Sequence, residues 1–170
     1  MSGISAVLNV EAHDENLDIG LDDKYLTKIS AELSEILAGT YRLTIKSHLY
    51  HWNVVGPLFK SLHELTEEHY DALFAATDII AERIRALGHL APVRLGDAAT
   101  FAPQVSEVKN TSAIDMIEDL IADHSDAVKT MRKAAKMAGD AGDAVTEDML
   151  TARLDFHEKA LWMLRAISAD

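Results

Sequence analysis

Hydrophobic residues recur at every third or fourth position along four long segments of the chain, a spacing typical of amphipathic α-helices with one buried face. The first three predicted helices cover residues 22–53, 61–87 and 112–138, and the fourth begins at Asp143 or Thr146 and runs to about Ile167. Elsewhere there is no alternating pattern of a strand, no internal repeat and no low-complexity segment. The pattern therefore predicts an all-α protein.

Residues that favour helix ends lie at the borders of these segments. The carboxylates of Asp22-Asp23 suit the free N–H groups and the positive dipole end of the first helix. Gly56-Pro57 is expected to break that helix after residue 53. Ser61-Leu62-His63-Glu64 has the form of a capping box, so the second helix is expected to begin there and to stop at Gly88. Ser112-Ala113-Ile114-Asp115 opens the third helix in the same style.

The connections differ in length. Residues 139–142 suit a tight turn, whereas residues 89–110 contain two prolines and are too long for one. We expect a short helix at about residues 97–101 within this long crossover. Residues 1–21 show no helical period and are expected to form an extended or mobile arm, and residues 22–168 to form one domain. Four long helices with one long crossover are typical of a ferritin-like four-helix bundle.

Composition and charge exclude several classes of function. A chain of 170 residues suits one globular domain, and the absence of cysteine excludes disulfides, iron–sulfur clusters and cysteine nucleophiles. With 16 Lys and Arg against 28 Asp and Glu, the net charge of −12 opposes non-specific binding to DNA phosphates. The longest uncharged run, residues 47–59, is shorter than the roughly 20 residues of a membrane span. The first 23 residues also lack the basic residues of a secretory signal, so we expect a cytoplasmic protein with no membrane association.

The second predicted helix carries His63, Glu67, Asp78 and Glu82 along one side. At about 100° per residue, these four positions spread over only about 100° of the helix surface. At about 1.5 Å per residue, however, the two pairs lie about 22 Å apart, so one chain cannot close a single small site with both.

Two interpretations of this face remain open from spacing alone. Asp and Glu are mostly exposed, so the face can be a solvated surface and nothing more. Alternatively, the short turn brings His51 towards His63 and Glu67, and a second subunit packed antiparallel about a two-fold axis would add its own Asp78 and Glu82. None of the eight histidines has a Glu three positions before it, so the Glu-x-x-His motif of intrachain di-iron bundles is missing.

At these residues the chain strongly resembles the Dps family, the mini-ferritins named as DNA-binding proteins from starved cells. The resemblance covers nearly the whole chain after residue 20. It is carried by His51-Trp52-Asn53-Val54, Gly56-Pro57, Phe59, Leu62-His63-Glu64-Leu65, Tyr70, Asp78-Ile79-Ile80-Ala81-Glu82-Arg83, Leu87-Gly88, Asp148-Met149-Leu150-Thr151 and His157-Glu158-Lys159-Ala160-Leu161-Trp162-Met163-Leu164.

The resemblance implies a hollow shell of twelve subunits, assembled from two-fold dimers, that acts as a ferroxidase. Such a shell oxidises Fe(II) to Fe(III), preferably with hydrogen peroxide rather than dioxygen, stores the ferric mineral and so protects DNA from oxidative damage. By position, His51, His63 and Glu67 of one subunit would bind and oxidise iron together with the partner subunit's Asp78 and Glu82.

Two positions differ from the usual pattern of the family. Residue 67 is usually Asp and is Glu67 here, which keeps the carboxylate and adds one methylene. Residue 48 is often Lys and is His48 here, an extra candidate ligand or the replacement of a salt-bridge partner.

Other residues have two possible roles each. Trp52, beside the predicted site, is expected to serve packing or to act as a sacrificial electron donor. Asp148 matches an acidic residue that lines three-fold pores in the family, and Asp143 and Glu147 lie nearby. A ring of carboxylates would concentrate cations at such a pore, whereas Asp143 and Glu147 can also serve only the N-terminal end of the fourth helix.

Two functions of other classes compete with a ferroxidase. A protector that binds DNA at the nucleoid needs a basic surface, and neither the acidic arm nor the end at Ala169-Asp170 supplies one. We therefore expect direct DNA binding to be weak or absent. A shell that holds Zn(II) or Mn(II) through Glu67 and His48 without turnover has the same ligand types as an Fe(II) site.

Overall fold

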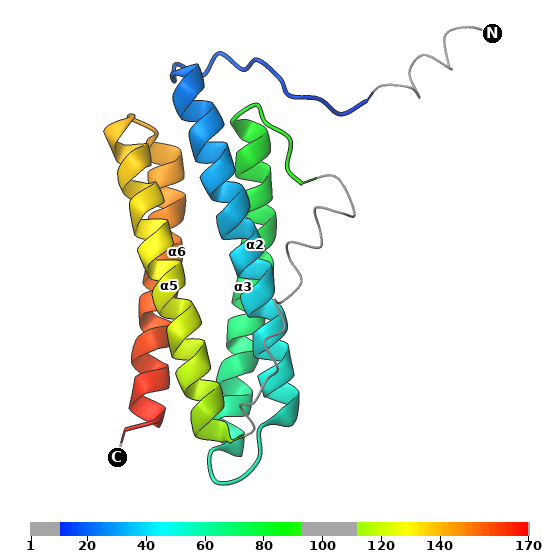
Figure 1. Ribbon diagram of the computed structural model, residues 1–170, viewed down its shortest axis with the longest axis vertical. Coiled ribbons are helices and arrows are strands. Elements are labelled where there is room, and N and C mark those ends of the chain that lie inside the picture. Colours follow the sequence, from blue (N-terminus) through cyan, green and yellow to red (C-terminus); the bar gives the residue numbers. More distant parts are fainter. Residues whose placement is uncertain (1–10, 93–111, 170) are drawn as a thin grey trace, which may run out of the picture.

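Four long helices make up the computed structural model, which describes residues 11–92 and 112–169 (Figure 1). They are α2 (Asp23–Asn53), α3 (Phe59–Ala86), α5 (Ala113–Asp140) and α6 (Ala144–Ile167). No strand occurs in the described residues, which confirms the predicted all-α fold. In the same part of the chain, no helix combines the length and apolar character needed to cross a membrane.

The chain order of the helices confirms the long crossover. A short turn joins α2 to α3 at one end of the bundle, and another joins α5 to α6 at the opposite end (Figure 1). As a result, α3 and α5 run in the same direction, and the end of α3 and the start of α5 lie at opposite ends of the bundle (Figure 1). The short helix expected at residues 97–101 lies outside the described residues.

Two of the predicted helix starts are confirmed, and of the two candidate starts of the fourth helix the structure selects Asp143. Side-chain oxygens of Asp22, Ser112 and Asp143 accept hydrogen bonds from backbone N–H groups in the first turns of α2, α5 and α6. These bonds satisfy N–H groups that have no partner inside the helix.

The capping box predicted at Ser61 and Glu64 is wrong. α3 begins at Phe59, because the Phe59 N–H already donates to the Gly56 carbonyl at 3.0 Å and the backbone is coiled before Ser61 is reached. The Ser61 hydroxyl instead donates to the carbonyl of Leu58 at 3.2 Å, and Glu64 pairs with Lys60. No side-chain cap closes the start of α3.

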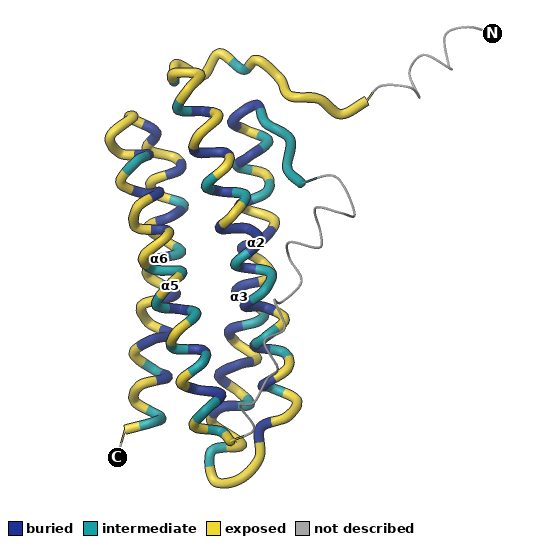
Figure 2. Tube along the Cα trace, viewed as in Figure 1, coloured by how far each residue is buried: buried dark blue, intermediate teal, exposed yellow. Residues whose placement is uncertain are grey.

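Buried side chains follow the inward sides of all four helices (Figure 2). They form two hydrophobic clusters, one towards each end of the bundle. Members of the first cluster with no exposed surface are Ile29, Leu33, Ala76, Ile80, Ile84 and Leu150, and those of the second are Leu62, Leu73, Ile117, Leu120 and Leu164.

The described part of the N-terminal arm contains no helix and is held against the end of α3. The Glu15 N–H donates to the Gly88 carbonyl at 2.7 Å, and the Leu90 N–H donates to Asp14 Oδ1 at 2.7 Å. An ion pair of 3.0 Å between Arg85 and Glu15 adds to this contact. The arm is therefore attached at residues 14–15 by both backbone and side-chain contacts.

Candidate metal centre

The turn between α2 and α3 places two histidines face to face. His51 Nδ1 lies 2.9 Å from the carbonyl oxygen of His63, and His63 Nδ1 lies 2.8 Å from the carbonyl oxygen of His51. The two rings stack, with centroids 3.7 Å apart and planes 18° apart. Because a carbonyl oxygen can only accept a hydrogen bond, each Nδ1 carries a proton, and in the neutral imidazole each Nε2 then keeps its lone pair.

Histidines that bind metal ions are oriented in the same way. A ligand imidazole usually donates its second ring N–H to a carboxylate or carbonyl oxygen, which fixes both the tautomer and the direction of the ring. His51 and His63 supply this orientation to each other, and both are only partly buried. They form a prearranged pair of nitrogen ligands.

Aromatic and carboxylate side chains surround the pair. The Tyr70 hydroxyl lies 3.4 Å from Glu67 Oε1, and the Tyr70 ring meets the edge of the His51 ring with centroids 5.4 Å apart. His48 stacks on Tyr70 at 3.9 Å and on Trp52 at 5.4 Å. The structure thus brings four of the predicted site residues and Trp52 to one end of the bundle.

Asp78 and Glu82 lie on the same helix but towards its other end. Both are exposed, and a rise of about 1.5 Å per residue places them about 22 Å from the His63 end. Across residues 11–92 and 112–169 of this one chain, no three His, Asp or Glu side chains are close enough to hold a metal ion. The structure therefore does not bring these two carboxylates to the histidines within one subunit.

The chain matches one protein-family model and is similar in sequence to many known proteins. Residues 30–170 match the model of the ferritin-like domain. An uncharacterized low temperature-induced protein from Nostoc sp. is 38% identical over 155 residues, which cover 88% of this chain and 85% of that protein. The DNA protection during starvation protein of Brevibacillus brevis is 33% identical over 138 residues, which cover 81% of this chain and 93% of that protein. The chain belongs to the Dps family of ferritin-like proteins.

Solved Dps structures agree with this assignment. The Vibrio cholerae Dps protein, described as a member of a broad superfamily of ferritin-like diiron-carboxylate proteins, superposes with a TM-score of 0.79. It is 28% identical and matches 92% of this chain and 98% of its own. The family resemblance carried by the motifs of α2 and α3 is confirmed.

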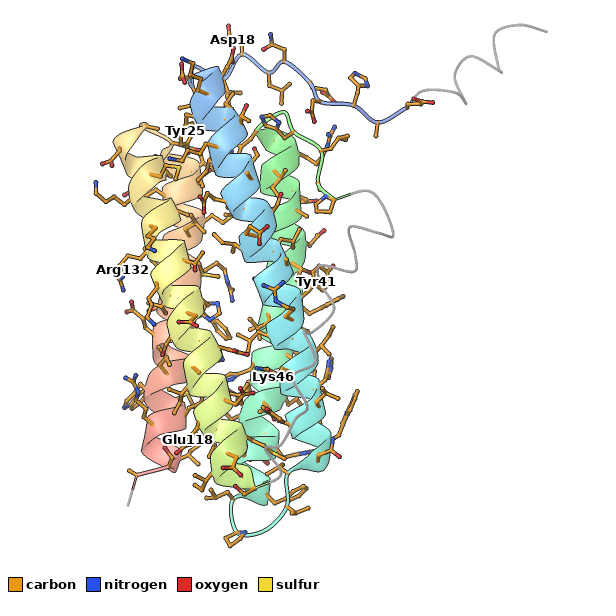
Figure 3. All side chains as sticks on the ribbon, in the orientation of Figure 1. Asp18, Tyr25, Tyr41, Lys46, Glu118 and Arg132 are labelled. Carbon is orange, nitrogen blue, oxygen red and sulfur yellow. The ribbon has the colours of Figure 1, made fainter. Side chains whose placement is uncertain are left out.

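In this Dps chain, Asp143 serves as a helix cap and not as an exposed pore residue. Its carboxylate is buried, pairs with Arg83 at 2.7 Å and accepts hydrogen bonds from the Tyr25 hydroxyl at 2.8 Å and from Thr146 (Tyr25 is labelled in Figure 3). Burial alone would raise the pKa of Asp143, but the hydrogen bonds from Thr146, Arg83 and Tyr25 outweigh it and hold the pKa below its usual value. Asp143 joins α2, α3 and α6.

The other two pore candidates are exposed. Glu147 lies in the first turn of α6, with its carboxylate over Gly139 on α5, and Asp148 follows it. A side chain at residue 139 would meet the Glu147 carboxylate at 2.7 Å. Both residues stay candidates for lining a pore between subunits.

Trp52 lies outside the core of the subunit, and both expected roles, packing and electron donation, stay predictions. Its side chain is 66% exposed, and its ring contacts His48 on the outer side of α2. Helical spacing places Trp52 beyond the buried face that contains Tyr50 and Val54, which are 3% and 1% exposed.

A buried polar cluster in the middle of the bundle was not predicted from the sequence. His69 on α3, His124 on α5 and His157 on α6 are buried, and His124 Nδ1 lies 2.9 Å from His157 Nδ1. Among the described residues, no hydrogen-bond partner reaches Nε2 of His124 or His157, or Nε and Nη2 of Arg153. A cavity of about 570 Å³ between α2 and α5 is lined at one point by His157.

Burial keeps these histidines neutral. Loss of solvent lowers the pKa of His69 to about 4. Loss of solvent, followed by the neighbouring His157, His69 and Arg153, lowers the pKa of His124 to about 2, and loss of solvent, followed by Arg153 and His69, lowers the pKa of His157 to about 3. A signal for this cluster was present in the sequence. Each histidine stands at a core position of its helix, as His124 does four residues after the buried Leu120.

Proposed function

We propose that this Dps protein is a ferroxidase that oxidises Fe(II), preferably with hydrogen peroxide, and stores the ferric product inside a shell of twelve subunits. The observation that carries the proposal is the pair His51 and His63, whose Nε2 atoms are free and whose rings are held by each other's backbone. Membership of the ferritin-like family supports iron as the substrate. Removal of Fe(II) and peroxide together would protect DNA from oxidative damage.

The proposed site is shared between two subunits because of the separation along α3. If two α3 helices pack antiparallel about a two-fold axis, the end with His63 and Glu67 meets the partner subunit's Asp78 and Glu82. The same contact generates two equal sites. Large apolar side chains beside this face support such an interface, since they are about half exposed or more in the single chain: Trp52, Phe59, Phe74 and Ile79.

Each ligand has a distinct role in the proposed reaction. The imidazoles of His51 and His63 and the carboxylate of Glu67 would bind Fe(II) from one subunit, with the partner subunit's Asp78 and Glu82 closing the site. Carboxylates attract Fe(III) more strongly than Fe(II) because of its higher charge, which favours oxidation. Hydrogen peroxide would take one electron from each of two Fe(II) ions and two protons, giving two water molecules and no hydroxyl radical.

Iron is proposed to enter through acidic openings between subunits. Glu147 and Asp148 are exposed next to each other at the start of α6, where they could form a ring of carboxylates about a three-fold axis. Such a ring raises the local concentration of cations. With Asp143 buried, these two residues are the remaining candidates.

The test is anaerobic loading of the assembled protein with a few Fe(II) per subunit, followed by peroxide or dioxygen while the ferric absorbance is recorded. We expect oxidation faster than in buffer, with about one peroxide consumed per two Fe(II), and loss of this rate in Asp78→Ala. Asp155→Ala, which removes an exposed aspartate from α6, is the matched control and should keep the rate. Oxidation no faster than in buffer would favour a shell that holds Zn(II) or Mn(II) without turnover.

A further inference from the structure

Tyr70 contacts three of the residues around the proposed iron site. Its hydroxyl lies 3.4 Å from Glu67 Oε1, its ring face stacks on His48 at 3.9 Å, and its ring meets the edge of His51 at 5.4 Å. The plane of the Tyr70 ring is 27° from that of His48 and 89° from that of His51. Tyr70 therefore lies at the point where the two groups of stacked rings meet.

The position of Tyr70 follows from helical spacing and the packing of two helices. Tyr70 is three residues after Glu67 on α3, so the two side chains are neighbours on the helix surface. His48 and His51 are likewise three residues apart on α2, and the Tyr70 ring contacts both. The phenol ring is thus held between α2 and α3 while its hydroxyl reaches the carboxylate.

Both positions that differ from the usual family pattern contact this tyrosine. Glu67 has one more rotatable bond than an aspartate, and a free side chain of this kind loses more conformational entropy when it binds a metal ion. His48 supplies a flat ring that can stack on Tyr70, which a lysine side chain cannot do. Both departures, the longer side chain of Glu67 and the ring of His48, therefore contact the same residue, Tyr70.

We propose that Tyr70 is a positioning residue that holds the Glu67 carboxylate in the direction needed for metal binding, an inference that rests on the proposed iron site. The hydroxyl donates to Oε1 and leaves Oε2 for the metal ion. A tyrosine hydroxyl is protonated at neutral pH, so it orients the carboxylate without adding a charge to the site. Hydrogen bonds of this kind are often long in the empty site and shorten when the ligand binds.

The test uses Co(II), which binds without redox chemistry, and a double-mutant cycle in the assembled protein. Wild type, Tyr70→Phe, Glu67→Asp and the double variant are titrated with Co(II) by calorimetry and by the d–d absorption of the bound ion. We expect Tyr70→Phe to weaken Co(II) binding about tenfold, the size expected for one hydrogen bond to a charged group. We also expect the d–d band to change, because the freed carboxylate takes another orientation.

The shorter side chain of the Glu67→Asp variant provides the decisive comparison. The aspartate side chain is one methylene shorter, so its carboxylate lies farther from the Tyr70 hydroxyl than that of Glu67. In this background Tyr70→Phe should therefore change the affinity for Co(II) less than twofold. An equal loss in both backgrounds would show that Tyr70 acts only through general packing and would overturn the inference. No loss in the wild-type background would overturn it as well.

Two controls separate the possible failures. Tyr70→Phe keeps the ring on His48, so its melting temperature should stay close to that of the wild type. If Asp78→Ala abolishes Co(II) binding while Tyr70→Phe has no effect, the inference fails and the shared site stands. If Asp78→Ala also leaves Co(II) binding unchanged, the shared site itself is wrong.

Discussion

The Nδ1 atoms of His124 and His157 lie 2.9 Å apart in the centre of the bundle, and neither ring has exposed surface. One Nδ1 donates and the other accepts, so one of the two rings must keep its Nδ1 lone pair. Besides loss of solvent, His69 on α3 and Arg153 on α6 lower both pKa values, His157 also lowers that of His124, and none of these groups is acidic. A proton added here would have no carboxylate to stabilise it.

Acid is therefore expected to destabilise the folded subunit. The folded-state pKa values of His124 and His157, about 2 and about 3, lie below the ordinary value of 6.5, so unfolding takes up protons as the pH falls below about 6.5. The contribution of the two histidines to the free energy of unfolding should be constant above that pH and should fall below it by about 1.4 kcal/mol per pH unit for each histidine that gains a proton on unfolding. Denaturant unfolding between pH 7.5 and 4.5 measures this slope.

His124→Asn tests the origin of the slope. The asparagine side chain can replace the Nδ1 contact to His157 and cannot gain a proton, so the pH dependence should become flatter. His13→Asn alters an exposed histidine of the arm and should leave the slope unchanged. A slope in His124→Asn equal to that of the wild type would contradict the prediction.

Asp143→Ala should lower the stability by about 3–5 kcal/mol, because it leaves the Arg83 guanidinium without its carboxylate partner and removes the cap of α6. Asp148→Ala alters an exposed carboxylate one turn later, and its effect on stability should be within about 0.5 kcal/mol. Urea unfolding measures both. If Asp148 lines an iron entry, Asp148→Ala should slow iron uptake while its unfolding curve matches the wild type.

Gly88→Ala should detach the N-terminal arm. A Cβ atom at Gly88 would lie 2.3 Å from the Glu15 carbonyl oxygen, so the arm must move. Gly56→Ala is the matched control, since its φ of +89° is close to the +90° of Gly88 but no atom lies within 4 Å of its Cβ position. Both variants carry about 1–3 kcal/mol of backbone strain, and only Gly88→Ala should expose residues 11–21 to limited proteolysis.

Direct DNA binding should be absent or weak at physiological salt. The net charge of −12 repels the phosphate backbone, and DNA affinity depends on Lys and Arg that neutralise phosphates. A gel-shift assay at low magnesium should show no retardation by the wild type. A variant with a short Lys-rich extension at the N-terminus should retard the same DNA, which controls for the assay, and tight binding by the wild type would show the prediction to be wrong.

Much of the fold could be predicted from local signals. The helical spacing of apolar residues such as Leu26, Ile29 and Leu33 identifies α2. The carboxylate of Asp22 and the hydroxyl of Ser112 mark the starts of α2 and α5. These signals work because a helix buries one face and must satisfy the N–H groups of its first turn. The start of α3 was predicted two residues late, because the turn at Gly56 coils the backbone before any side-chain signal appears.

By itself, the sequence determined the four helices and the shared face of His63, Glu67, Asp78 and Glu82, because these depend on spacing along one helix, and it determined the long crossover through the length of the segment between two helices. Only the tertiary structure decided which atoms meet across helices. Nδ1 of His51 and Nδ1 of His63 each contact the other residue's carbonyl oxygen, and Asp143 is buried against Arg83. Three helices bring His69, His124 and His157 together in the core. Those contacts depend on the angle and register at which helices pack, and no spacing within a single helix encodes them.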